Sequence, residues 1–370
     1  MKILICAAGS GGHIYPALSL AQSLQAADKN IQIFFLSNKK AISREIFKKT
    51  SDKVFIADFI SPYRGKWTNP FKFFLKNLGF LLKFISETIK VFFLILSLKP
   101  DAVIGFGGIV SITAISFARL LGAPTLIHEQ NIMPGQANKL LSRYVTKVAV
   151  GFKQSSKYFK QAVVFTGNPL RQDIEQVDQL AACESLGLGK NLFTILIFGG
   201  SQGSRFLNTS FTQAIAGLEH NLKHDLQIIH ISGTKDVAAL VDFYQQQNIQ
   251  AKVFSYCGKM SVVYSAADLV IGRAGAGTIN EVCFFAKPII FIPYPYAGGH
   301  QKLNAEFMRK QGAACLLFEN NLTVEHLQQD IRRLIENRDV LLSMGQKSRE
   351  LFVPQSEVKL AKLVLAMIKA

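Results

Sequence analysis

A short apolar run, a glycine-rich turn and a helical stretch follow one another twice along this chain. The first copy joins the run 3–7 to Gly9-Ser10-Gly11-Gly12-His13, and the second joins 194–198 to Gly199-Gly200-Ser201-Gln202-Gly203. Further apolar runs that alternate with helical stretches lie at 31–36, 102–104, 124–127, 145–150, 228–231, 269–271 and 289–292. Strands that alternate with helices form parallel sheets. The sequence therefore predicts an α/β protein of two Rossmann-like domains that face a cleft.

The length of the chain agrees with such a division, since 370 residues are enough for two or three domains. We place the boundary near Gly167-Asn168-Pro169, so that the N-terminal domain spans 1–166. Ligands of open parallel sheets bind beyond the carboxyl ends of the strands. We therefore expect the ligand in the cleft, against the glycine turns.

Charge and cysteine content narrow the functional class. The formal net charge is +17, which favours an anionic partner such as nucleic acid, an anionic membrane or a phosphorylated substrate. The five cysteines include no C-x-x-C pair, so we expect reduced thiols and neither a disulfide framework nor a zinc ribbon. The longest stretch without Asp, Glu, Lys or Arg, 3–27, is interrupted by glycines and Pro16, so it does not predict a spanning helix.

The first glycine turn does not fit the common nucleotide motifs. Gly9 and Gly11 begin a dinucleotide fingerprint, but Ile14 stands where a third glycine belongs. Ser37 and Asn38 occupy the end of the second strand, where an acidic residue would bind ribose. No Gly-Lys-Ser/Thr follows a glycine cluster, which excludes a Walker A loop. A glycine turn can also be present only because the helix that follows it packs closely, without binding a ligand.

Seven motifs in order carry a more specific signal. They are Gly9 to Pro16, Gly105-Phe106-Gly107-Gly108, His128-Glu129-Gln130-Asn131, Gly167 to Arg171, Gly199 to Ser204, Arg273 to Thr278 with Glu281, and His300-Gln301 with Asn304. This set closely resembles the MurG family, the bacterial transferases that convert lipid I to lipid II with UDP-N-acetylglucosamine (UDP-GlcNAc). The resemblance covers nearly the whole chain. It implies the GT-B architecture, with a C-terminal domain at 167–355 that binds the donor and a last helix, 356–370, that packs back on the N-terminal domain.

The resemblance also implies a site for UDP-GlcNAc. Its residues would be Ser10, Gly11, Gly12, Asn131, Arg171, Ser201, Cys257, Ala276, Gly277, Thr278, Glu281, Gln301 and Asn304. The backbone at 276–278 would open a helix whose N-terminus stabilises the diphosphate. Glu281 would accept both ribose hydroxyls, while Gln301 and Asn304, three residues apart on one helix face, would bind the GlcNAc hydroxyls. Glu281 could instead be a favourable acid in the first turn of its helix. Gln301 and Asn304 could belong to a solvated helix face, and Cys257 could be a buried core cysteine.

His13 is the candidate general base, because an imidazole can accept a proton at neutral pH. Glu129 is a possible orienting partner or an alternative base. His13 could instead cap its helix or bind phosphate. We assign the acceptor pyrophosphate to Gly11, Gly12, Gly107 and Gly108. No His-rich or Asp-x-Asp cluster offers metal ligands, so we expect no metal and no cofactor.

A lipid acceptor calls for a membrane-docking surface, and the segment 70–98 suits this role. Lys72, Lys76, Lys83 and Lys90 fall on one stripe at about 100° per residue, among Phe71, Phe73, Phe74 and Phe80. Basic side chains attract anionic lipid, and four lysines oppose a spanning helix. We expect a peripheral protein on the cytoplasmic face of the inner membrane. The alternative is a segment that only covers the N-terminal sheet.

Three other functions stay open. A nucleic-acid binder would explain the charge, but no recognised motif supports it, so we expect no nucleic-acid partner. A non-catalytic nucleotide-sugar sensor would keep the donor motifs without the base. Another GT-B transferase could act on a different membrane lipid such as diacylglycerol, although the run His128-Glu129-Gln130-Asn131 favours lipid I. Other cell-wall synthesis proteins are conceivable partners that the sequence does not identify.

Overall fold

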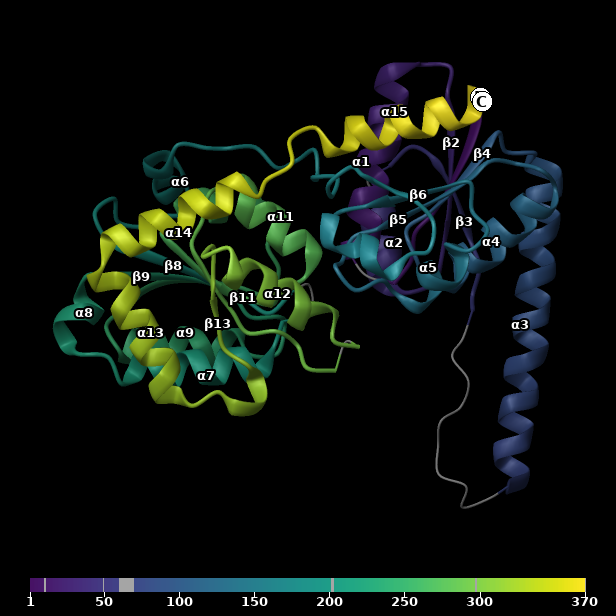
Figure 1. Ribbon diagram of the computed structural model, residues 1–370. Helices are drawn as coiled ribbons and strands as arrows, with labels where there is room; N and C mark the ends of the chain where they lie inside the picture. Colours follow the sequence, from purple (N-terminus) through teal and green to yellow (C-terminus); the bar gives the residue numbers. More distant parts are fainter. Residues whose placement is uncertain (10, 49, 60–69, 201–202, 297, 370) are drawn as a thin grey trace. The chain divides into compact units, whose positions relative to one another are not determined.

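The computed structural model describes residues 1–370 except 10, 49, 60–69, 201–202, 297 and 370, and it describes no side chains at 41–42 and 70–78 (Figure 1). The chain forms two compact units, with Met1–Arg171 and Val353–Ala370 in unit 1 and Gln172–Phe352 in unit 2. The first division falls after Arg171, beyond the predicted 166, because two residues there bind helix α1 (Gly11–Ala27). Ser19 Oγ donates to the Leu170 carbonyl at 2.7 Å, and the Arg171 guanidinium lies 4.1 Å from the Tyr15 ring centroid.

Unit 1 contains a seven-stranded parallel sheet, counted over the described residues, in the order β3-β2-β1-β4-β5-β6-β7. Its strands are β1 (Lys2–Cys6), β2 (Gln32–Ser37), β3 (Lys53–Ile56), β4 (Ala102–Gly105), β5 (Thr125–Glu129), β6 (Lys147–Val150) and β7 (Val163–Phe165). Besides α1, its helices are α2 (Ala41–Phe47), α3 (Pro70–Leu98), α4 (Ile109–Leu120), α5 (Gln136–Leu141), η1 (Lys153–Tyr158) and α15 (Ser356–Lys369).

The unit 1 sheet is buried on both faces, which explains why its strands read as continuous apolar runs. Along β1, Ile3 and Ile5 pack into a core with α1 and α15, whereas Leu4 and Cys6 pack into a second core with α3 and α4. Helix α15 belongs to unit 1, and Figure 1 shows it running beside α1. The last helix therefore completes the layer that covers one face of this sheet.

Unit 2 repeats the design with a six-stranded parallel sheet, again over the described residues, in the order β10-β9-β8-β11-β12-β13. Its strands are β8 (Phe193–Phe198), β9 (Leu226–Ile231), β10 (Gln250–Phe254), β11 (Leu269–Gly272), β12 (Ile289–Phe291) and β13 (Cys315–Leu316). Its helices are α6 (Gln179–Ser185), α7 (Arg205–Ala216), α8 (His220–His224), α9 (Val237–Gln246), α10 (Met260–Ala266), α11 (Ala276–Phe284), α12 (His300–Lys310), η2 (Glu319–Asn321), α13 (Val324–Glu336) and α14 (Arg338–Glu350). The predicted class, two parallel α/β sheets, is confirmed.

Both sheets reverse their winding direction at a central pair of strands, β1 and β4 in unit 1 and β8 and β11 in unit 2. The loops on either side of such a point lead to helices on opposite faces, which leaves a crevice for ligands. The predicted glycine turns follow these four strands. The topology thus places the turns where open α/β sheets bind ligands.

Two glycines of the turn after β8 differ in what surrounds them, and this difference predicts their tolerance of alanine. Gly200 and Gly203 both have positive φ, +94° and +75°. A Cβ on Gly200 would meet nothing within 4 Å, but one on Gly203 would lie 2.1 Å from the Ser232 carbonyl oxygen. Gly200→Ala should lower the free energy of unfolding by about 1–2 kcal/mol, the cost of a left-handed residue.

Gly203→Ala should lower the free energy of unfolding by more than about 3 kcal/mol, because the backbone at Ser232, directly after β9, must also move away. Denaturant unfolding of the two variants checks this order. Equal losses would mean that the close approach of Gly203 to the Ser232 carbonyl does not exist in solution.

Candidate active site

His13 is held by a backbone carbonyl in the first turn of α1. Its Nδ1 lies 3.0 Å from the carbonyl oxygen of Ala8. A carbonyl can only accept, so this bond requires the proton on Nδ1, and in a neutral imidazole the lone pair then lies on Nε2. The side chain is partly exposed. The bond therefore favours the tautomer of His13 whose Nε2 can accept a proton.

The second glycine turn lies against this ring. A Cβ on Gly107 would be 3.5 Å from Cε1 and 3.6 Å from Nε2 of His13, which are van der Waals distances, so the turn lies directly against the ring. Ser111 closes the turn, since its Oγ donates to the Gly107 carbonyl at 2.7 Å. Gly107 and Gly108 have φ values of +109° and +79°. The structure thus brings the turns after β1 and β4 together at the imidazole.

Glu129 shapes the neighbouring loop after β5. Its Oε1 accepts from the backbone N–H of Asn131 at 2.9 Å and from the Asn131 side chain at 3.2 Å. Its Oε2 accepts from the Gly135 N–H at 3.0 Å and from Asn138 Nδ2 at 2.8 Å. The residue is 2% exposed. This carboxylate clamps the loop that carries Asn131, and the group that orients His13 is the Ala8 carbonyl.

His128 ties the same loop to the end of unit 1. Its Nε2 donates to the Gly167 carbonyl at 3.0 Å, and its Nδ1 accepts from Gln130 Nε2 at 3.1 Å. The side chain is fully buried. Burial lowers the pKa of the imidazole to about 4, although the hydrogen bond to Gly167 opposes the shift. His128 is a neutral structural residue at neutral pH.

The predicted donor residues are divided between the two units. Asn131 and Arg171 belong to unit 1, together with Gly11 and Gly12. Arg171 is partly exposed, and its guanidinium stacks on the Tyr15 ring of α1. Ser10 and Ser201 lie outside the described residues. The remaining predicted donor residues belong to unit 2.

Helix α11 begins with an open N-terminus in unit 2. Its N-cap is Gly275, which has no side chain to satisfy the first N–H groups. A Cβ on Gly277 would meet nothing within 4 Å, and Gly277 and Thr278 are partly exposed, whereas Ala276 is buried. Exposed N–H groups at a helix N-terminus favour an anion. The local geometry therefore suits a phosphate group.

Glu281 lies one turn further along α11. Its Oε2 accepts a hydrogen bond from the hydroxyl of Tyr264 in α10 at 3.0 Å. Glu281 is partly exposed, whereas Tyr264 is fully buried. Sequence reasoning did not single out Tyr264, because a tyrosine in an apolar helix looks like an ordinary core residue.

The two amides of α12 have different surroundings. Gln301 is partly exposed, and its Oε1 accepts from the Tyr294 backbone N–H at 2.9 Å. Asn304 is 0% exposed, and its Nδ2 donates to the Ala274 carbonyl at 3.2 Å. Asn304 thus holds the turn before α11 from beneath. Cys257, in the loop after β10, is partly exposed.

Arg273 connects the loops at this edge of the unit 2 sheet. It donates to the Ile292 carbonyl and to Ser204 Oγ, both at 2.9 Å, and it forms an ion pair with Glu319. Ser204 is the N-cap of α7 and accepts from the Leu207 N–H. A guanidinium has five N–H donors and can hold several loops at once. The sequence signal for Arg273 was its position, as a charged residue between an apolar strand and a glycine turn.

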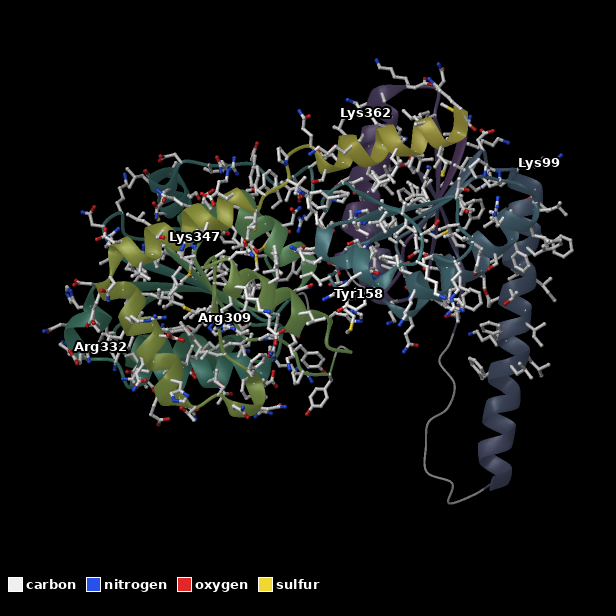
Figure 2. All side chains as sticks on the ribbon, viewed as in Figure 1. Lys99, Tyr158, Arg309, Arg332, Lys347 and Lys362 are labelled. Carbon is white, nitrogen blue, oxygen red and sulfur yellow. The ribbon has the colours of Figure 1, made fainter. Side chains whose placement is uncertain are left out.

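Helix α3 is apolar on two opposite sides. Val91 and Ile95 are each 1% exposed, in the core of unit 1. The opposite side carries apolar side chains that are 41–61% exposed, at Leu82, Ile85, Ile89, Phe93 and Leu96, which we call the α3 apolar stripe. Carbon-rich side chains stand out from α3 on the side turned away from the rest of unit 1 (Figure 2). A helix with a second, exposed apolar side fits contact with a second apolar environment.

The lysines of α3 lie beside this stripe. Lys83 pairs with Asp58 at 2.6 Å, and Lys90 pairs with Glu87 at 2.7 Å. The hydrogen bond from Lys83 lowers the pKa of the Asp58 carboxyl. Phe80 has a described side chain, but those of Phe71, Lys72, Phe73, Phe74 and Lys76 lie outside the described residues. Acidic neighbours therefore compensate two of the four predicted lysines.

Two features are absent from the residues that the structure describes. No helix among them is both long and apolar enough to cross a membrane. No three of their His, Cys, Asp or Glu side chains are grouped as metal ligands would be.

Two family models match this chain. Residues 3–150 match the N-terminal domain of glycosyltransferase family 28, and residues 194–362 match its C-terminal domain. The first match spans β1 to β6, and the second begins in β8. Fold and sequence together define a glycosyltransferase of family 28.

Closer relatives identify the branch of this class. Proteins of Thermoanaerobacter sp. (strain X514) and Geobacter sulfurreducens are each 34% identical, covering 98% and 95% of this chain and 99% and 94% of their own. Both are named UDP-N-acetylglucosamine–N-acetylmuramyl-(pentapeptide) pyrophosphoryl-undecaprenol N-acetylglucosamine transferase. The crystal structure of Acinetobacter baumannii MurG is 30% identical, with a TM-score of 0.77 over 99% of both chains. The chain belongs to the MurG family.

The buried imidazole of His128 predicts a pH-dependent stability. In the unfolded chain its pKa is about 6.5, and in the fold it is about 4. Between these values the unfolded state binds a proton that the native state does not, so the free energy of unfolding falls as the pH falls. The slope is about 1.4 kcal/mol per pH unit, and it vanishes above the unfolded pKa.

Denaturant unfolding between pH 5 and pH 7 measures this slope. His128→Gln keeps an amide that can donate to Gly167 and removes the titration. The free energy of unfolding of unit 1 should then vary less steeply with pH, by up to about 1.4 kcal/mol per pH unit. Identical slopes for variant and parent would show that His128 titrates alike in both states.

Proposed function

We propose that this protein transfers GlcNAc from UDP-GlcNAc to the 4-hydroxyl of the N-acetylmuramic acid of lipid I, undecaprenyl-pyrophosphoryl-MurNAc-peptide. The product would be lipid II, for peptidoglycan synthesis. Two full-length relatives at 34% identity carry the name of this transferase. The observation in the structure that supports the proposal best is the bond between His13 Nδ1 and the Ala8 carbonyl, with Nε2 beside the second glycine turn.

His13 acts as the general base in this proposal. The Ala8 carbonyl fixes the proton on Nδ1, so Nε2 receives the proton of the 4-hydroxyl as its oxygen attacks the anomeric carbon. One displacement of UDP inverts the α-linked donor to a β-1,4 product. The backbone of Gly11, Gly12, Gly107 and Gly108 binds the acceptor pyrophosphate, since glycine turns allow close approach of N–H groups to an anion.

The open N-terminus of α11 stabilises the charge that develops on the leaving diphosphate. Thr278 adds a hydroxyl donor there, and Glu281 accepts the ribose hydroxyls. Gln301 binds the GlcNAc hydroxyls, Arg171 contacts phosphate, and Cys257 lies against uracil. Asn131 contacts the sugar, and Asn304 supports the turn at Ala274. No metal or cofactor takes part in this scheme.

The decisive test is incubation of the purified protein with labelled UDP-GlcNAc and lipid I, with the product analysed by mass. A new lipid heavier by one GlcNAc residue, with release of UDP, supports the proposal. Transfer to diacylglycerol but not to lipid I would favour a transferase for another lipid. UDP-GlcNAc binding without any transfer would favour a nucleotide-sugar sensor.

His13→Ala should lower the turnover number by about 10²- to 10⁴-fold, the range for a lost general base. The affinity for UDP-GlcNAc should hardly change, because the base acts in the transition state. Steady-state kinetics and calorimetry separate the two quantities. Near-normal turnover with a raised KM for the donor would instead make His13 a binding residue.

We also propose that the protein docks peripherally on the cytoplasmic face of the inner membrane through α3. The N-terminal part of this helix extends past the other elements of unit 1 (Figure 1). The α3 apolar stripe would enter the headgroup region, where each buried apolar side chain contributes about 1.5–3 kcal/mol. The lysines Lys72, Lys76, Lys83 and Lys90 would attract anionic lipid, with the last two weakened by their ion pairs.

The triple change Leu82→Gln, Ile89→Gln and Phe93→Gln should lower partitioning onto anionic vesicles by at least about tenfold. These side chains are 50–61% exposed, so the fold and UDP binding should survive. Leu342→Gln in unit 2 is a matched control, since Leu342 is 61% exposed on α14. Co-sedimentation that is the same for the triple variant, the control and the parent would refute this docking surface.

A further inference from the structure

Tyr264 is fixed in place by two aromatic contacts. Its ring stacks on Phe285 with centroids 5.2 Å apart, and it meets Phe198 edge to face at 5.9 Å. Phe198 ends β8, directly before the glycine turn, and Phe285 is the C-cap of α11. The ring therefore packs against both segments that flank the donor half of the site. Its rotation would require both to move.

The hydroxyl of Tyr264 is the polar part of this cluster, and it donates to Glu281 Oε2 at 3.0 Å. A phenylalanine would fill the same volume, so packing alone does not explain a tyrosine here. A buried hydroxyl needs a partner, and one partner in this structure is the partly exposed carboxylate of Glu281 on α11. The bond thus runs from the rigid core to a side chain that reaches the surface.

A glutamate side chain has several rotatable bonds, and fixing it costs conformational entropy when a ligand binds. A bond from the core reduces this cost, because the carboxylate is already oriented before the ligand arrives. An ionised carboxylate has about four acceptor positions, so it can keep the tyrosine and still accept from two ribose hydroxyls.

We infer that Tyr264 is a positioning residue, which holds the Glu281 carboxylate in the orientation that receives the ribose diol of the nucleotide. Tyr264 thereby sets the preference for ribonucleotides over deoxyribonucleotides. This inference rests on the proposed role of Glu281 in donor binding. A site built to bond hydroxyls discriminates strongly against a ligand that lacks them.

The test uses the full chain and two probes, UDP and 2′,3′-dideoxy-UDP, with affinities measured by calorimetry. Tyr264→Phe should weaken UDP binding by about threefold to tenfold, the range for one hydrogen bond. It should leave binding of the dideoxy probe unchanged. The KM for UDP-GlcNAc should rise with little change in turnover, since the contact is the same in ground and transition states.

Tyr244→Phe is the matched control. Tyr244 is 1% exposed in the same unit, and its hydroxyl bonds to His230 Nδ1 at 2.8 Å. Both variants lose one buried hydroxyl bond, but the control should bind both probes like the parent. In a Glu281→Ala background Tyr264→Phe should cause no further loss, which keeps the test valid even if the single variant is less stable.

The outcomes separate the two claims. If Glu281→Ala weakens UDP binding while Tyr264→Phe does not, or weakens both probes equally, the positioning role is overturned and the donor site stands. If Glu281→Ala leaves UDP affinity unchanged, the ribose role of Glu281 and the inference fail together.

Discussion

The register of the parallel strands at the centre of each sheet is the constraint on which this site depends. In unit 1 Cys6 pairs with Gly105, and in unit 2 Phe198 pairs with Gly272, so neighbouring strands end at the same height. The turns that follow must then begin side by side. In unit 1 this brings the second glycine turn against His13. A shift of one residue in this register would turn every side chain of the shifted strand to the opposite face of the sheet, and it would separate these groups.

Backbone groups fix three of the polar residues at these edges. His13 bonds to a carbonyl in its own turn, Asn304 bonds to the turn before α11, and Gln301 accepts from a backbone N–H. Backbone groups do not titrate, so the orientation of these side chains does not depend on the charge of a neighbouring residue. These side chains are thus oriented before a substrate arrives, which reduces the reorganisation required during reaction.

The sequence predicted the fold because buried parallel strands read as apolar runs, and it predicted the turns because their glycines are unusual. It could not predict which side of a helix is buried. Gln301 and Asn304 share a helix face, yet one is partly exposed and the other is buried. Tertiary partners were also hidden, since Lys83 pairs with Asp58, and Tyr264 bonds to Glu281, across long sequence separations. These contacts follow from packing, which local periodicity does not contain.

The proposed mechanism depends most directly on the protonation of His13. Nitrogen-15 NMR of the selectively labelled histidine measures which ring nitrogen carries the proton at neutral pH. The account predicts a proton on Nδ1, bonded to the Ala8 carbonyl, and a bare Nε2 in the free protein. A proton found on Nε2 with a bare Nδ1 would contradict it, because the nitrogen beside the second glycine turn could not then accept one.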